Sequence, residues 1–210
     1  MSSIRDITVA VDLEGTLVSR SFYLTKVESY LDEEGITVHE LDRLRRALAN
    51  ELLMALSTFR KRSLVWTGCS PKRAKGIIAR AGLIVPPTME VITRDRYLEA
   101  LGRSRVVTDA EEAIRTDGRY RDSLIDKVRR GGVKIPCVLG VDFLLDDFGD
   151  MDGEVCALLE AADLSYAGES RKPIEVKSFH LATMERLREH HLERGLLSAV
   201  EELQRRAVSR

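Results

Sequence analysis

The sequence has few of the residues that mark several special protein classes. Its three cysteines, at positions 69, 137 and 156, are odd in number and widely spaced, and they form neither a CxxC pair nor a zinc-type cluster. We expect them to be reduced and mostly buried. No apolar run is long enough to span a bilayer, and the first residues lack the pattern of a signal peptide. These absences predict a cytoplasmic protein with no membrane partner.

The chain also lacks an excess of charge of either sign. Lys and Arg total 33 against 34 Asp and Glu, a formal net charge of −1, so binding of nucleic acid over the whole surface is not indicated. With 210 residues, 44% hydrophobic and 32% charged, the composition is that of an ordinary globular protein. We expect a single domain over residues 1–210. The sequence leaves the oligomeric state open, a homodimer included.

Strand-like and helix-like patterns alternate along the chain. Apolar or β-branched runs predict strands at 4–11, 63–66, within 83–91, and at 105–107, 141–145 and 174–176. Amphipathic periodicity and stop signals predict helices at 22–34, 39–60, 71–81, 154–162 and 181–206, with short helical stretches within 95–130. This alternation indicates an α/β fold with a Rossmann-like, doubly wound and mainly parallel sheet.

Three predicted strands end in polar residues, namely Asp12, Thr67 and the pair Asp146 and Asp147. Because the carboxyl ends of parallel strands lie at one edge of the sheet, these residues are expected to meet there despite their separation in the chain. Carboxylates gathered in one pocket repel one another unless a cation lies between them. Hard oxygen ligands suit Mg²⁺, which also binds substrate phosphate. The pattern therefore predicts a magnesium and phosphate site.

Phosphoryl transfer needs a nucleophile, cations, hydrogen-bond donors and a proton shuttle. Asp12 can act as the nucleophile by forming an aspartyl-phosphate. The turn at Gly15 and Thr16 offers backbone N–H groups, and Thr67 offers a hydroxyl and its own N–H. A positive charge is still required. Lys134, twelve residues before Asp146, is the candidate for it, and Lys127, seven residues earlier, is the alternative.

These residues resemble the motifs of the haloacid dehalogenase-like (HAD) hydrolase superfamily. Residues 12–17 (Asp-Leu-Glu-Gly-Thr-Leu), after an apolar strand, are similar to the first motif, usually Asp-x-Asp-x-Thr. Residues 63–68 are similar to the second motif, Lys134 to the third, and residues 143–147 with Asp150 to the fourth. The order and spacing agree from residue 4 to about residue 150.

The resemblance implies a Rossmann-like fold and Mg²⁺-dependent phosphoryl transfer. It implies catalytic roles for Asp12, the nucleophile, and Glu14. The implied phosphate-binding residues are Gly15, Thr16, Thr67, Gly68 and Lys134. The implied metal ligands are Asp12, Glu14 through its backbone carbonyl, Asp146, and Asp147 or Asp150, which would hold the metal waters. By the same resemblance, residues 18–62 form a small helical cap-like insertion, too short for a large lid. A thin lid leaves the mouth open and suits a bulky substrate, even a phosphorylated macromolecule, so the expected partner is a phosphorylated small molecule or an exposed phosphate on a macromolecule.

Glu14 departs from the superfamily pattern, which has a second Asp there as the general acid. Glutamate adds a methylene, and a misplacement of about 1 Å can cost on the order of a hundredfold in rate. General acid catalysis itself contributes about 10² to 10⁴. We therefore expect a slower phosphatase, a phosphatase re-shaped around the longer acid, or a domain that binds phosphate without turning it over.

Three other functions compete with phosphatase activity. A non-catalytic HAD-like phosphate-binding or interaction domain is favoured by Glu14. A receiver-like phospho-acceptor fits poorly, because its acidic pair would come first in the chain and here it comes late. A dehalogenase would not need the acidic pair for a metal. Cys69 has no histidine partner placed by a motif, so we interpret it as a small packing residue and not as a nucleophile.

Overall fold

The computed structural model describes residues 8–18, 38–59, 61–117, 122–146, 155–159 and 174–175. Its strands form one sheet in the order β3-β2-β1-β4-β5, with every neighbouring pair parallel. The strands are β1 (Thr8–Asp12), β2 (Arg62–Trp66), β3 (Met89–Ile92), β4 (Phe143–Asp146) and β5 (Ile174–Glu175). The predicted α/β class with a parallel sheet is therefore confirmed.

The strand order reverses next to β1. The chain passes from β1 to β2 and β3 on one side and then returns to add β4 on the other side of β1. In open parallel sheets such a reversal leaves a crevice at the carboxyl ends of the two strands, where ligands bind. A ligand site is thus expected at the carboxyl ends of β1 and β4.

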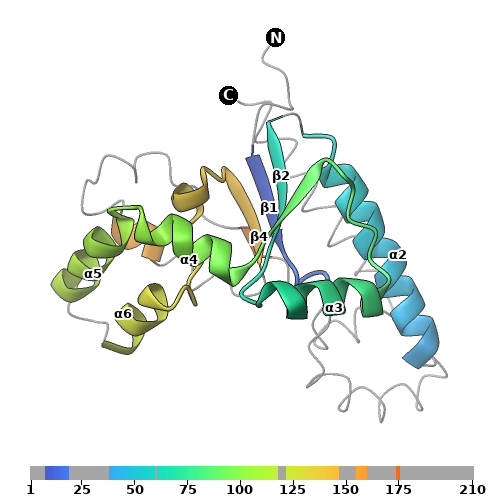
Figure 1. Cartoon of the computed structure of the whole chain (residues 1–210), viewed down its shortest axis with the longest axis horizontal. Coiled ribbons are helices and arrows are strands. Elements are labelled where there is room, and N and C mark those ends of the chain that lie inside the picture. The colour runs from blue at the N-terminus through green and yellow to red at the C-terminus, as the bar shows by residue number, and fades with distance from the viewer. Residues whose placement is uncertain are drawn as a thin grey trace.

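Helices lie on both faces of this sheet (Figure 1). They are α2 (Val38–Leu56), α3 (Pro71–Ala81), α4 (Arg94–Gly102), α5 (Val106–Asp117), α6 (Asp122–Arg129), the 3-10 helix η1 (Pro136–Leu139) and a short helix at 155–159. In Figure 1, α2 and α3 lie on one side of the strands, and α4, α5 and α6 lie on the other. This is the layering expected of β-α-β connections that cross over both faces.

Side chains of β1 alternate between two hydrophobic cores, which explains why the strand is apolar on both faces. Val9 and Val11 pack in a core that also contains Leu53 of α2, whereas Ala10 belongs to a core with Tyr97 of α4. All three β1 side chains are fully buried. The sheet is therefore held from both faces by burial of apolar surface, the main stabilising term in folding.

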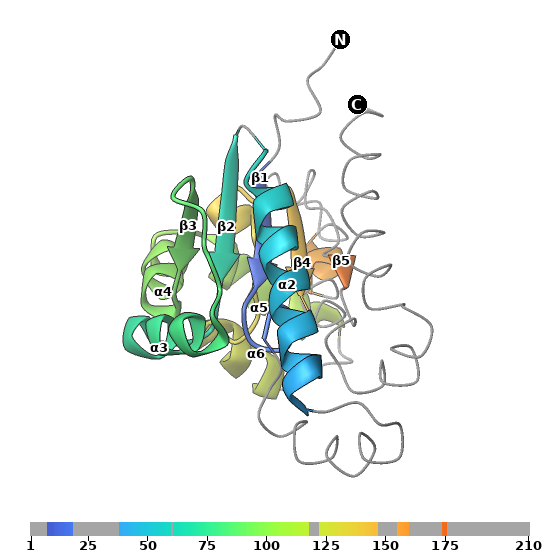
Figure 2. The same ribbon diagram turned by 90° about the vertical axis from the view of Figure 1, so that its right-hand side faces the viewer.

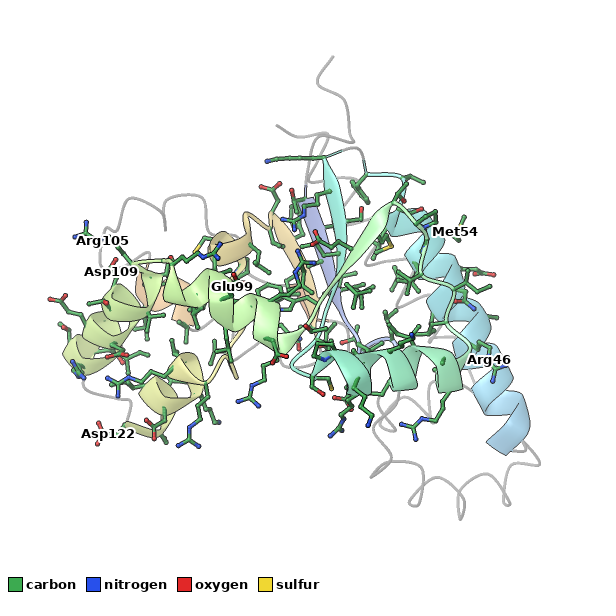
Figure 3. The ribbon with its side chains drawn as sticks, viewed as in Figure 1. Arg46, Met54, Glu99, Arg105, Asp109 and Asp122 are labelled. Atoms are coloured by element: carbon green, nitrogen blue, oxygen red, sulfur yellow. The ribbon has the colours of Figure 1, made fainter. Side chains whose placement is uncertain are left out.

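Helix α2 makes up most of the described part of the segment 18–62, which the sequence predicts as an insertion. Its Leu52 and Leu56 belong to the same core as β1, and α2 crosses in front of the sheet in Figure 2. Its outer side carries Met54, which is 57% exposed and points away from the sheet in Figure 3. This helix therefore covers the face of the sheet. Residues 19–37 lie outside the described residues, so a cap formed by them stays a prediction.

The helix predicted over 71–81 is confirmed as α3. Pro71 occupies its first turn after the N-cap residue Ser70, whose side chain makes no capping hydrogen bond. Gly82 ends the helix at φ 62°, a left-handed conformation, and donates its N–H to Ala79 at 3.2 Å. Since residues other than glycine adopt this conformation at a cost, Gly82 fixes where α3 stops.

The strand predicted at 105–107 is wrong. Val106 and Val107 begin α5, and the N–H of Asp109 bonds the carbonyl of Arg105 at 3.2 Å as the helix starts. Figure 3 shows Arg105 and Asp109 close together at this end of α5. Val106, Ala110 and Ile114 share one buried helix face, and packing on that face overrides the β-branched preference for strands. The other predicted strands are present with shifted ends.

Two predicted helices, 22–34 and 181–206, lie outside the described residues. The predicted helix at 154–162 is described at 155–159, and the predicted helix at 39–60 ends at Leu56. Helix α2 ends at Leu56 because the hydroxyls of Ser57 and Thr58, which follow it, bond the carbonyls of Met54 and Ala55, each at 2.7 Å. Within the described ranges, no helix combines the length and apolar character needed to cross a membrane.

Candidate functional site

The two strands at this reversal, β1 and β4, both end in aspartate. The register pairs Val11 of β1 with Leu145 of β4, so Asp12 and Asp146 come next to each other at the sheet edge. Their side chains are 6% and 2% exposed. The ammonium group of Lys134 donates to Asp12 Oδ1 and to Asp146 Oδ2. The structure thus brings together three residues that the sequence analysis selected.

The segment around Lys134 is fixed by a tyrosine on α4. The hydroxyl of Tyr97 donates to the carbonyl of Val133 at 2.9 Å and accepts from the N–H of Ile135 at 3.0 Å. Val133 and Ile135 are fully buried on either side of Lys134, whose ammonium group reaches the carboxylates. Lys127, the alternative cation, lies exposed in the last turn of α6.

Thr67 lies directly beyond β2 and is 1% exposed. Its N–H donates to the carbonyl of Ile92 at 2.9 Å, so the donor that the sequence assigned to phosphate extends the sheet instead. Its hydroxyl oxygen accepts from the N–H of Cys69 at 3.2 Å. A hydroxyl that accepts a hydrogen bond keeps its own proton for donation. Gly68, next in the chain, is exposed, and a Cβ there would meet nothing within 4 Å.

A tight turn follows Asp12. The N–H of Gly15 donates to the carbonyl of Val18 at 2.7 Å, and the N–H of Val18 donates to Leu13 at 2.8 Å. The φ of Gly15 is 106°, which excludes most side chains at this position. The N–H that the sequence analysis offered to phosphate therefore closes the turn. Thr16, also predicted to bind phosphate, is fully buried within it.

Glu14 reaches across to the segment that follows β2. Its Oε1 accepts a 2.8 Å hydrogen bond from Arg73, and its Oε2 accepts from the thiol of Cys69. Burial raises the pKa of the Cys69 thiol, and the hydrogen bond to Glu14 raises it further. The sequence analysis missed Arg73 and this role of Cys69. The signal available in the sequence was that Cys69 and Arg73 lie two and six residues after Thr67, at the same edge of the sheet.

The remaining predicted metal ligands, Asp147 and Asp150, lie outside the described residues. In the part of the chain that the structure describes, no three His, Cys, Asp or Glu residues form a group that could hold a metal. Asp12 and Asp146 do come together, and Mg²⁺ is commonly held by one or two carboxylates with water and substrate phosphate. One lysine against two carboxylates also leaves negative charge to be balanced. These donors therefore fit Mg²⁺.

Comparison with known proteins gives no relative from which a function could be carried over. No protein-family model, curated protein or solved structure matches the chain. The candidate site holds a buried carboxylate at a strand end, a lysine against it, a buried threonine directly beyond the next strand and a glutamate beside the turn.

Proposed function

We propose that the protein is a Mg²⁺-dependent phosphohydrolase that acts through an aspartyl-phosphate on Asp12, as in the HAD-like superfamily that its motifs resemble. The observation that carries the proposal is the contact of Lys134 with both Asp12 and Asp146. A buried carboxylate beside a lysine at the end of a central parallel strand is suited to accept a phosphoryl group. The substrate of this reaction is a phosphate ester.

The proposed reaction has two steps at Asp12. In the first, a carboxylate oxygen of Asp12 attacks phosphorus, the bond from phosphorus to the leaving oxygen breaks, and that oxygen takes a proton. In the second, water attacks the same phosphorus, gives up a proton, and releases inorganic phosphate and the free carboxylate. Both steps follow the pattern of covalent catalysis by carboxylate nucleophiles.

Two donors serve the transferring group in this scheme. The ammonium of Lys134 is already against Asp12, where it neutralises charge on the phosphoryl oxygens, and Thr67 directly follows Trp66, the register partner of Asp12 on the neighbouring strand. Donors held in place before reaction stabilise developing charge without reorganisation. Mg²⁺, held by Asp12 and Asp146, would supply the positive charge that lets a phosphate dianion approach two carboxylates.

Glu14 is the proton shuttle of this proposal. Arg73 and Cys69 hold its two carboxylate oxygens in one orientation, and its side chain is 30% exposed. An arginine partner favours the charged carboxylate. Glu14 is therefore better suited to take the proton from water in the second step than to donate one in the first.

The same contact favours a second candidate function, a HAD-like domain that binds phosphate and turns it over weakly or not at all. If Arg73 keeps Glu14 charged, the leaving group receives little acid help, and esters with poor leaving groups react slowly. Such a domain would still bind phosphate through Lys134 and Thr67. The two candidates differ in turnover and not in binding.

Hydrolysis of a panel of phosphate esters, including p-nitrophenyl phosphate, tests the first candidate. We expect turnover that requires Mg²⁺, stops with a chelator and is lost in Asp12→Asn, while Asp122→Asn, an exposed residue at the start of α6, retains it. Calorimetry with phosphate and Mg²⁺ tests the second. Binding without turnover, and no activity gained in Glu14→Asp, would replace the phosphatase with the binding domain.

A further inference from the structure

A cavity of about 460 Å³ opens beside the loop that follows β2. Gly68 lines it from that loop, and Arg94 lines it from the start of α4. The end of α6 and the turn after it contribute further lining residues, among them Lys127, Arg130 and Gly132. Its volume is within the range of about 300 to 1,000 Å³ that is usual for small-molecule sites.

The cavity lies between the two segments that carry the proposed phosphate ligands. Gly68 directly follows Thr67, and Gly132 comes two residues before Lys134. The N–H of Arg94 donates to the carbonyl of Cys69 at 3.0 Å, which ties the start of α4 to the loop after β2. A molecule whose phosphate contacts Thr67 and Lys134 therefore has this cavity beside it.

The lining carries more positive than negative charge. Arg94, Lys127 and Arg130 are cationic, and the lining carboxylate is Asp126, 4.0 Å from Arg130 in an exposed pair. Exposed pairs at such a separation contribute little. Within the described ranges, no carboxylate lies within ion-pair distance of Arg94. Cations gathered around a concave surface attract anions.

Gly68 adds no side chain to the cavity wall. Nothing lies within 4 Å of the position that a Cβ would take there, and the residue is exposed. The cavity that Gly68 lines is therefore not narrowed by a side chain at this position.

We propose that this cavity binds a second anionic group of the substrate, and that the substrate is a small phosphate ester carrying a second phosphate or a carboxylate. The inference rests on the proposed function, because it takes Thr67 and Lys134 as ligands of the scissile phosphate. The cavity's size selects small molecules, and its charge selects those with a second anion.

Non-hydrolysable probes test the inference without relying on turnover. The probes are α,ω-alkane bisphosphonates of two to six carbons, each compared with the monophosphonate of the same length by calorimetry in Mg²⁺. We expect at least one bisphosphonate to bind about tenfold or more tightly than its monophosphonate, a difference of about 1.4 kcal/mol. Carboxyalkyl phosphonates of the same lengths show whether a carboxylate serves as the second anion.

Charge variants locate the effect. The double variant Arg94→Gln with Lys127→Gln should lose the bisphosphonate advantage and keep monophosphonate binding. Lys75→Gln removes one exposed charge from α3 outside the cavity and should change neither affinity. Higher salt should reduce the advantage as well, since exposed charges are screened.

Two results would overturn the inference. One is a panel in which no bisphosphonate or carboxyalkyl phosphonate exceeds its monophosphonate by more than the twofold statistical factor for two equivalent ends. The other is an advantage that survives the double variant. Hydrolysis of p-nitrophenyl phosphate, measured in parallel, shows which of the two proposals fails. Turnover without tighter binding of a bisphosphonate removes the cavity proposal alone. Tighter binding of a bisphosphonate without turnover removes the phosphatase proposal alone.

Discussion

The ammonium group of Lys134 contacts the carboxylate of Asp12, which lies 122 positions earlier in the chain. The same group contacts Asp146, twelve positions later, at the end of the neighbouring strand. Two buried carboxylates in adjacent positions would repel each other, and the lysine between them reduces that repulsion. This arrangement is the basis of the function proposed for the protein.

Replacing Lys134 by methionine should destabilise the protein. The change leaves two buried carboxylates without the partner they share, and breaking a buried ion pair costs about 3 kcal/mol or more. Urea unfolding followed by fluorescence of Trp66, the single tryptophan and 1% exposed, measures the loss. Mg²⁺ should restore part of it. Lys75→Met, on the exposed side of α3, is the matched control and should be nearly neutral.

If Lys134→Met unfolds at the same urea concentration as the wild type, the lysine does not hold the carboxylates together. The double variant with Asp146→Asn refines the test. Removing one of the two carboxylates reduces the repulsion, so the double variant should lose less stability than the two single losses added. Additive losses would show that the two residues do not interact.

Gly15→Ala and Gly76→Ala should change stability in opposite directions. Alanine at position 15 must adopt a φ near 106°, a strain of about 1 to 3 kcal/mol. Gly76 lies inside α3 with nothing within 4 Å of a built Cβ, so alanine there should stabilise by about 0.5 to 1 kcal/mol. Thermal or urea unfolding of both variants checks this. A Gly15→Ala variant as stable as the wild type would show that the turn after Asp12 has another conformation.

Glu14→Gln should slow the second step of the reaction more than the first. Glutamine keeps the shape of the side chain but cannot donate or take a proton. Because Glu14 takes the proton from water in the second step, kcat should fall by about 10² or more. For p-nitrophenyl phosphate, kcat/KM reports the first chemical step and should fall much less. Equal losses in kcat and kcat/KM would show that Glu14 is not the base of the second step.

Cys69 should become more reactive when Glu14 is neutralised. Burial and Glu14 both raise the pKa of this thiol, so less thiolate is present at a given pH, and the thiolate is the reactive form. In Glu14→Gln, alkylation of Cys69 by iodoacetamide at mildly alkaline pH should be a few times faster. Cys137, whose pKa is raised by burial, is the internal reference and should not change. An unchanged rate at Cys69 would mean that Glu14 does not hold the thiol.

The raised pKa of Cys69 also makes the folding stability depend on pH in the alkaline range. The unfolded chain releases the Cys69 proton at lower pH than the folded chain does. This contribution is therefore complete below the unfolded pKa and is lost as pH rises through the folded one. Urea midpoints measured across the alkaline range should fall less in Cys69→Ser than in the wild type.

The sheet and its acidic edge could be predicted from the sequence, because each strand carries its own signal. A strand that is apolar on both faces and ends in Asp12, and a later one that ends in Asp146, place both residues at one edge once the sheet is parallel. Neither step needs knowledge of side-chain packing. The choice of Lys134 over Lys127 does need knowledge of side-chain packing. Tyr97 fixes the segment around Lys134 by bonding two backbone groups that lie 36 and 38 positions away in the chain.

The wrong strand at 105–107 and the missed contacts of Glu14 have different origins. Local preference of Val106 and Val107 favoured a strand, and the spacing of Val106, Ala110 and Ile114 on one helix face was the stronger signal. The partner of Glu14, Arg73, lies 59 positions away, and no local pattern predicts such a pair. Contacts between distant residues emerge only when the elements are packed.

Trapping the phosphorylated enzyme tests the central claim most directly. Wild-type protein turning over a phosphate ester with Mg²⁺ is quenched with borohydride, which reduces an aspartyl-phosphate to homoserine, and peptides are then sequenced by mass spectrometry. We predict homoserine at position 12, absent without Mg²⁺ or substrate. Turnover with an unmodified Asp12, or with homoserine at another aspartate, would contradict the account.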